Sequence, residues 1–170
     1  MAEDLKTSKE SGAHLALSKL AGQWKGIAKV WFDPNKVEDE SPVSGSMKLI
    51  FNGKYILHEY AGSFAGKPLE GIAIIGFNLA INRFEYAWID SFHTGTSVMF
   101  SEGQRNQREL SVLGSYYYVT PEAEQKWGWR TEIKQEDDDH LTITAFNVFP
   151  DGTEAKATEA KYERVALLPD

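Results

Sequence analysis

The fold is decided by residues 44–64, which read SGSMKLIF-NG-KYILHEYAGSF. Two runs rich in aliphatic and aromatic residues flank Asn52-Gly53, a pair that readily adopts the positive φ angles of a tight type I′ turn. The stretch therefore predicts a β-hairpin that reverses at Asn52-Gly53. From residue 22 onward, similar short runs recur between turn residues, at the spacing typical of an all-β sandwich or barrel.

Other turn signals divide the rest of the chain into strands. The runs between these signals predict ten strands, over residues 22–32, 44–51, 54–64, 70–78, 83–91, 94–103, 108–118, 126–135, 140–149 and 155–165. A meander of this length leaves two edge strands unless it closes on itself. We therefore expect an all-β protein, a single closed or nearly closed antiparallel β-barrel of about ten strands, with a two-sheet sandwich as the alternative.

The N-terminal region differs in composition from the rest. Residues 1–13 are polar and are predicted to form a flexible tail, and residues 14–20 are predicted to form one short helix that closes an end of the barrel. The chain of 170 residues suits one domain, which we place at residues 14–168. The start lacks the apolar run of a secretory signal, so we expect the mature chain to begin as written.

Composition excludes several classes of partner. The chain carries 18 Lys and Arg against 25 Asp and Glu, and its net charge of −7 repels nucleic acid. No run approaches the ~20 apolar residues of a membrane span, and no cysteine is present to form a disulfide or a thiolate metal site. We expect a soluble cytoplasmic protein that binds neither nucleic acid nor membranes.

Motifs that mark common catalytic sites are absent. The sequence holds no G-x-S-x-G, G-x-x-x-x-G-K-[ST], G-x-G-x-x-G or H-E-x-x-H motif. Its four histidines are scattered, and the three aspartates at 137–139 lack the glycine-containing spacing of a calcium loop. We therefore expect no metal and no cofactor, and we name no catalytic residue.

Seven short motifs carry a resemblance to a known family. They are Gly22-Gln23-Trp24, Phe51-Asn52-Gly53-Lys54-Tyr55, His58-Glu59-Tyr60-Ala61-Gly62, the segment 66–71, Gly76-Phe77-Asn78, Trp88-Ile89-Asp90-Ser91 and the segment 158–164. The first resembles the G-x-W start of lipocalin-like barrels. In order and spacing the series is similar to the lipocalin-like family catalogued as domain of unknown function 1579, over about residues 18–165. The resemblance implies a lipocalin or calycin-like barrel and no established activity or ligand.

Alternating patterns indicate which side chains face the interior. Phe84, Tyr86 and Trp88 alternate with charged residues and are predicted to point inward. Over residues 126–135 the simplest interpretation is that Trp129 and the residues at every second position from it point inward. Over residues 54–64 the pattern does not decide which set of side chains points inward. Tryptophan and tyrosine bring a polar tip to an apolar wall, a mixture found in small-molecule cavities. We expect ligand-binding residues at Trp24, His58, Tyr60, Phe77, Tyr86, Trp88, Asp90 and Trp129, unless these rings simply fill the barrel.

Three functions are compatible with these observations. The first is a barrel that binds a small apolar or amphipathic molecule. The second is a metal-independent enzyme that uses a rim carboxylate or histidine, namely Asp90, His58 or Glu59, with burial in an apolar mouth raising the pKa of the carboxylate. The third is a homodimer formed through outward-facing residues such as Ile27, Trp31 and Tyr117.

Overall fold

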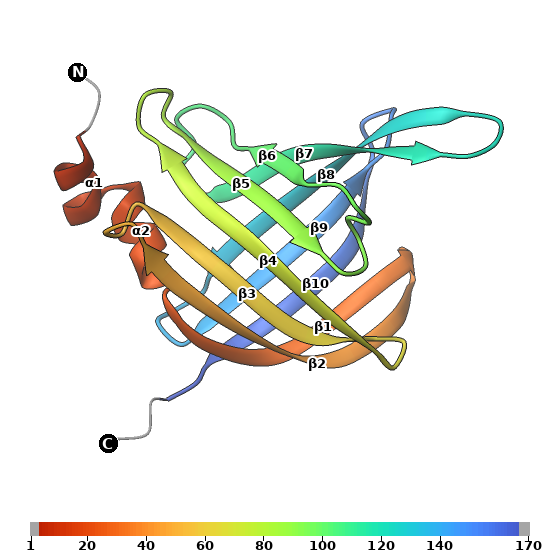
Figure 1. Cartoon of the computed structure of the whole chain (residues 1–170), viewed down its shortest axis with the longest axis horizontal. Helices are drawn as coiled ribbons and strands as arrows, with labels where there is room; N and C mark the ends of the chain where they lie inside the picture. Colours follow the sequence, from red (N-terminus) through yellow and green to blue (C-terminus); the bar gives the residue numbers. More distant parts are fainter. Residues whose placement is uncertain (1–3, 167–170) are drawn as a thin grey trace.

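The barrel closes because its first and last strands pair with each other. In the computed structural model, which describes residues 4–166, β1 hydrogen-bonds to both β2 and β10 and no edge strand remains. Every neighbouring pair is antiparallel (Figure 1). The strands are β1 (Gly22–Asp33), β2 (Lys36–Ile50), β3 (Tyr55–Phe64), β4 (Lys67–Asn78), β5 (Arg83–Asp90), β6 (Met99–Glu102), β7 (Leu110–Val119), β8 (Glu124–Gln135), β9 (His140–Val148) and β10 (Glu154–Arg164). The predicted closed barrel is confirmed, and the sandwich alternative is excluded.

Two strands differ in length from the prediction. β2 begins at Lys36 rather than residue 44, because its polar first half pairs with the end of β1 across two register shifts. β6 covers only four residues, because residues 91–98 form a loop rather than strand. The predicted hairpin at Asn52-Gly53 is present, but its turn is wider, since Phe51, Asn52 and Gly53 all have positive φ.

Two helices, rather than the predicted single one, precede the barrel. α1 (Leu5–Ser11) lies in the segment expected to be a tail, and α2 (Ala13–Lys19) matches the predicted helix. The hydroxyl of Ser8, buried in α1, lies 2.9 Å from Nδ1 of His14 in α2, which ties the helices together. Both lie at the barrel end that carries the β2–β3 turn (Figure 1). No helix within residues 4–166 is long and apolar enough to cross a membrane. The predicted domain end at residue 168 lies outside the described residues.

Strand alternation places the predicted side chains in the interior. Phe84, Tyr86 and Trp88 of β5 are buried, as predicted. Trp129 of β8 is also buried, which confirms the inward parity of that strand. In β3, where the sequence left both faces open, the inward side chains include His58.

The barrel end next to the helices is closed and filled. Trp24 is 1% exposed, and its indole Nε1 donates a hydrogen bond to the carbonyl of Leu20 at 2.9 Å. The guanidinium of Arg164 lies over the indole at 4.2 Å and donates to the carbonyls of Ala21, Lys19 and Asp138. Glycine suits residue 22, because its φ of 150° is one that other residues rarely adopt and a Cβ would lie 2.3 Å from Nη1 of that guanidinium. Further core side chains fill this half: Leu17, Met47, Ile56, Ile75, Phe84, Val112, Ile133 and Leu141.

Candidate functional site

The other half of the barrel contains a cavity of about 100 Å³. Six of the eight predicted ligand-binding residues line it: His58, Tyr60, Tyr86, Trp88, Asp90 and Trp129. The other two lie near the closed end, where Trp24 packs under Arg164 and Phe77 packs edge-on against Phe84. The lining also includes side chains that the sequence analysis did not select, among them His93, Thr131, Ala145 and Tyr162.

One wall of the cavity is a stack of aromatic rings. The indoles of Trp88 and Trp129 stack with centroids 5.5 Å apart and an angle of 22° between planes. The imidazole of His93 lies 5.8 Å from the first and 5.6 Å from the second. This packing fixes the orientation of His93 and offers a flat apolar surface to a bound molecule.

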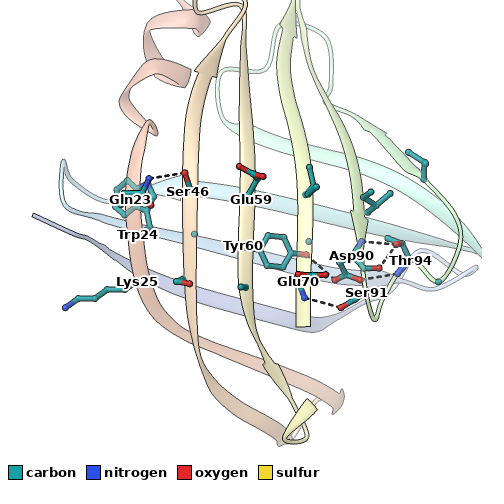
Figure 2. Close-up of a pocket in the computed structure, with 18 of the residues that line it drawn as sticks. Gln23, Trp24, Lys25, Ser46, Glu59, Tyr60, Glu70, Asp90, Ser91 and Thr94 are labelled. Atoms are coloured by element: carbon teal, nitrogen blue, oxygen red, sulfur yellow. Dashed lines mark hydrogen bonds between the residues drawn. The ribbon is translucent and has the colours of Figure 1, made fainter. Parts of the chain in front are cut away.

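A hydrogen-bonded chain of side chains supports this wall. Nε1 of Trp88 donates to Oη of Tyr60 at 2.8 Å, and Tyr60 donates to Oδ2 of Asp90 at 3.1 Å. Figure 2 shows the Tyr60 ring directed towards Asp90. Gly71 makes this arrangement sterically feasible, because a Cβ at that position would overlap the tyrosine ring. Tyr60 of β3 is therefore tied to β5 through both functions of its hydroxyl, which donates to Asp90 and accepts from Trp88.

Asp90 organises the loop that follows β5. Its Oδ2 lies 2.6 Å from Nδ1 of His93, and its Oδ1 accepts the backbone N–H groups of Phe92, His93 and Thr94. Burial raises the pKa of Asp90, but the hydrogen bonds from the His93 ring and from the backbone outweigh burial and hold the pKa below its ordinary value. The expected raised pKa of a rim carboxylate is therefore wrong for Asp90. Because the carboxylate accepts, Nδ1 of His93 carries a proton.

Two histidines present unpaired nitrogens inside the barrel. His58 is 3% exposed, and neither of its ring nitrogens has a hydrogen-bond partner among residues 4–166. Burial lowers the pKa of His58 to about 4, so its ring is neutral at neutral pH. Nε2 of His93 is likewise buried without a partner in the described part of the chain. Buried polar atoms are normally paired, so these nitrogens mark the cavity as a place for a polar group from outside the chain.

Two tyrosine hydroxyls share the interior with these histidines. Tyr86 and Tyr162 are buried, and burial raises the pKa of each, so both hydroxyls are protonated at neutral pH. Within the described residues, no hydrogen bond is formed by either hydroxyl. The cavity thus combines apolar walls with neutral groups that can both donate and accept. Residues 4–166 hold no group of three or more His, Cys, Asp or Glu side chains placed to bind a metal ion.

A shallow groove runs across the outside of the barrel. It has a volume of about 1000 Å³, and outward-facing residues of β1 to β5 and the loop 94–98 line it together with Tyr60 and Asp90, which also line the inner cavity (Figure 2). Glu59, a predicted candidate acid, belongs to this groove and forms an ion pair with Lys48 at 3.3 Å. Its carboxylate therefore faces solvent outside the barrel, separate from the inner cavity.

The residues suggested for a dimer surface do not form one patch. Ile27 on β1 and Tyr117 on β7 are exposed, but three strands separate β1 from β7. Trp31 is half-buried, with the ammonium of Lys156 5.2 Å from its ring centre.

Comparisons with known proteins agree with this architecture. The structure is similar to that of Rv2717c from M. tuberculosis, with a TM-score of 0.60, 14% identity, and 92% of this chain and 99% of that chain covered. It is also similar to the S-type phycobiliprotein lyase CPES from Guillardia theta, with a TM-score of 0.56, 11% identity, and 98% and 100% covered. A designed fluorescence-activating barrel covers 88% of this chain, at a TM-score of 0.48 and 12% identity. At these identities the likeness to Rv2717c and to the lyase concerns the fold alone.

The sequence comparisons identify a family. No curated protein matches the chain. The model of the family described as "protein of unknown function (DUF1579)" matches residues 9–164, which is most of the chain. The protein is therefore a closed ten-stranded β-barrel that belongs to the DUF1579 family.

Proposed function

We propose that this protein binds a small amphipathic molecule inside the barrel. The observation that carries the proposal is His58, a buried histidine whose two ring nitrogens are both unpaired beside a cavity. Leaving a buried polar group without a partner costs about 1–3 kcal/mol. A ligand that brings hydrogen-bonding atoms into the cavity would remove this cost on binding, and the stacked indoles of Trp88 and Trp129 would hold its apolar part.

The size of the cavity limits the ligand. Drug-sized ligands occupy pockets of roughly 300–1000 Å³, whereas an engineered apolar cavity of about 150 Å³ binds benzene. A cavity of about 100 Å³ suits a molecule, or the inserted end of a molecule, no larger than about one ring. Ser63 and Leu69 near the strand ends also line the cavity, so a longer ligand would extend towards the barrel end opposite the helices, which we call the open end.

Native mass spectrometry of freshly purified protein tests the proposal directly. We expect a fraction of the protein to carry an additional small mass that denaturation releases. The same preparation should lose tryptophan fluorescence intensity on titration with small aromatic probes, because Trp88 and Trp129 line the site. Absence of bound mass, together with fluorescence that no probe alters, would contradict the proposal.

Two alanine-to-leucine variants locate the site. Ala145 is buried and lines the inner cavity, whereas Ala61 is exposed and lines the outer groove. Ala145→Leu fills the cavity and should abolish binding, at a stability cost of about 1–3 kcal/mol from overpacking. Ala61→Leu adds the same atoms outside the barrel and should leave binding unchanged. The reverse result would move the site to the outer groove.

A second candidate function is catalysis by the pair Asp90 and His93. Their 2.6 Å contact and the unpaired Nε2 of His93 resemble a general base that a carboxylate orients. If this candidate is right, the natural protein converts the molecule found by mass spectrometry into a species of different mass, and Asp90→Asn does not. Recovery of that molecule unchanged after incubation with the natural protein would leave binding as the function.

A further inference from the structure

Although the barrel is closed, the β7–β8 hairpin extends beyond the neighbouring strands (Figure 1). β7 pairs with β8 along its whole length but with β6 only at Leu113, and β9 pairs with β8 only from Gly128 onward. In the described part of the chain, the outer hairpin therefore has two edges that no strand covers, residues 115–119 on β7 and residues 124–127 on β8. On such an edge, the backbone N–H and C=O groups of every second residue lack a partner from the sheet.

The two edges differ in their protection against association. Proteins commonly protect an exposed edge with charged residues, proline or a β-bulge. The β8 edge carries Glu124 and Lys126. The β7 edge, Ser-Tyr-Tyr-Tyr-Val, carries neither charge nor proline, and its pairing with β8 runs without a register shift. Its tyrosines and valine also favour extended backbone. The β7 edge is therefore the one suited to accept another strand.

The side chains of the β7 edge are exposed as well. Tyr117 and Val119 lie on the face of β7 opposite to the buried Val112, and they are 62% and 65% exposed. Tyr118 on the other face is 51% exposed and packs on Trp127 of β8, with ring centroids 5.4 Å apart. Because a two-stranded ribbon is only marginally stable by itself, a further strand would both cover these side chains and stabilise the hairpin.

The β7 edge is complementary to itself. When two copies of residues 115–119 pair antiparallel about a two-fold axis at Tyr117, this tyrosine lies opposite its own equivalent. Tyr116 then lies opposite Tyr118. Aromatic pairs in directly opposite positions stabilise antiparallel strands, whereas a charged residue on the axis would face its own copy and oppose pairing. The same segment thus supplies both halves of an isologous contact.

We propose that two copies of this chain associate through the β7 edges of their hairpins, which join into one four-stranded antiparallel sheet. Of the residues first suggested for a dimer surface, only Tyr117 belongs to this contact. Residues 115–119 do not line the inner cavity, so the inference is independent of the proposed function.

The size of the contact predicts a weak, reversible dimer. A fully buried tyrosine covers roughly 150–250 Å², so three partly covered side chains from each copy give an interface at or below the ~1,200 Å² lower end of stable complexes. The charge of −7 on each chain also opposes association. We therefore expect a dissociation constant in the micromolar range.

Sedimentation equilibrium tests the proposal. The natural protein should show a monomer–dimer equilibrium between micromolar and millimolar concentration. Tyr117→Lys places like charges opposite each other on the axis and should weaken association at least about tenfold. Ile74→Lys is the matched control, at a 45% exposed apolar residue on the outer face of β4, and should leave association unchanged. A natural protein that stays monomeric, or a dimer that only Ile74→Lys weakens, would overturn the proposal.

Cysteine variants test the register. The chain has no cysteine, so Tyr117→Cys introduces a single thiol. Directly opposite residues of antiparallel strands have Cα atoms about 4.5–5.5 Å apart, within reach of a disulfide, and oxidation should give a covalent dimer. In Tyr118→Cys the two thiols lie on diagonal positions about 7–8 Å apart and should cross-link much more slowly. The opposite order of rates would overturn the two-fold axis at Tyr117.

Amide hydrogen exchange of the natural protein gives a test that needs no variant. As the concentration rises and dimers form, backbone amides within residues 115–119 should exchange more slowly, while those of residues 124–127 keep their rates. Dimers in which the β7 amides gain no protection would show that association uses another surface.

Discussion

The two halves of the barrel differ in how they satisfy buried polar groups, although Nε of Arg83, beside Phe84 in the closed half, also lacks a partner among residues 4–166. At the closed end, the indole of Trp24 donates to a carbonyl, and Arg164 donates to three more. In the open half, both nitrogens of His58 and one of His93 are buried without a partner in the described residues. The difference indicates that the polar groups of the closed end contribute to stability. In the open half, unpaired polar groups lower the stability but can form hydrogen bonds with a ligand.

Trp24→Ala should have the largest effect on stability. Removing a fully buried tryptophan leaves a large void at the closed end, and we expect the free energy of unfolding to fall by about 3–5 kcal/mol in urea denaturation. Trp31→Ala, at a half-buried tryptophan outside the core, is the control and should cost much less. Equal losses would mean that the closed end is not the better-packed region.

His58 should make the stability of the open half depend on pH. The pKa of His58 is about 4 in the folded protein against an ordinary value of 6.5, so between these values the unfolded chain binds a proton that the folded chain does not. Acidification therefore favours unfolding. From pH 7 to pH 5, the natural protein should lose about 2 kcal/mol more stability than His58→Phe. Parallel losses in both proteins would show that folded His58 takes up the proton freely.

Arg164→Lys should produce a smaller loss at the closed end. An ammonium keeps the charge but cannot reproduce the planar fork that reaches the carbonyls of Lys19, Ala21 and Asp138. We expect a loss of about 1–2 kcal/mol, measured by urea denaturation. Arg105→Lys at an exposed position is the matched control and should be neutral. No difference between the two variants would mean that charge alone holds this end.

Phe92→Ala at the open end should have the smallest effect. Its ring is 42% exposed and packs on Phe64 with centroids 4.4 Å apart. Exposed aromatic pairs contribute about 0.5–1.5 kcal/mol, so the melting temperature should fall by only a few degrees. A loss as large as that of Trp24→Ala would contradict the contrast between the two ends.

Much of the fold follows from local patterns in the sequence. Turn residues and two-residue alternation were sufficient to predict ten strands, because hairpins and side-chain direction depend on near neighbours. Alternation placed Tyr86, Trp88 and Trp129 inward, whereas His58, Tyr60 and Asp90 were selected by residue type, and all six line the cavity. The sequence could not separate Trp24 and Phe77 from these residues, because depth along the barrel depends on strand register, which alternation does not determine.

The remaining site residues depend on contacts between distant segments. His93 lies in a loop, and its position results from hydrogen bonds to Asp90 that no periodic pattern reveals. The short spacing between these two residues is the only local signal. Tyr162 meets His58 because β10 reaches across to β1 and closes the barrel. The helix α1 was missed because its sequence is polar: its one buried residue is Ser8, next to His14, and Lys9 donates to the carbonyl of Asn52.

The hydrogen bonds of the Arg164 guanidinium have a consequence for biosynthesis. Arg164 and Ala21, which it contacts, are 143 positions apart in the chain, and β1 has no second partner until β10 arrives. During synthesis, one edge of β1 therefore stays unpaired until nearly the whole polypeptide has left the ribosome. Its backbone N–H and C=O groups are exposed to other chains during that time. Ring closure is then a late step in folding, and nascent chains interrupted before residue 154 should be the species that chaperones retain.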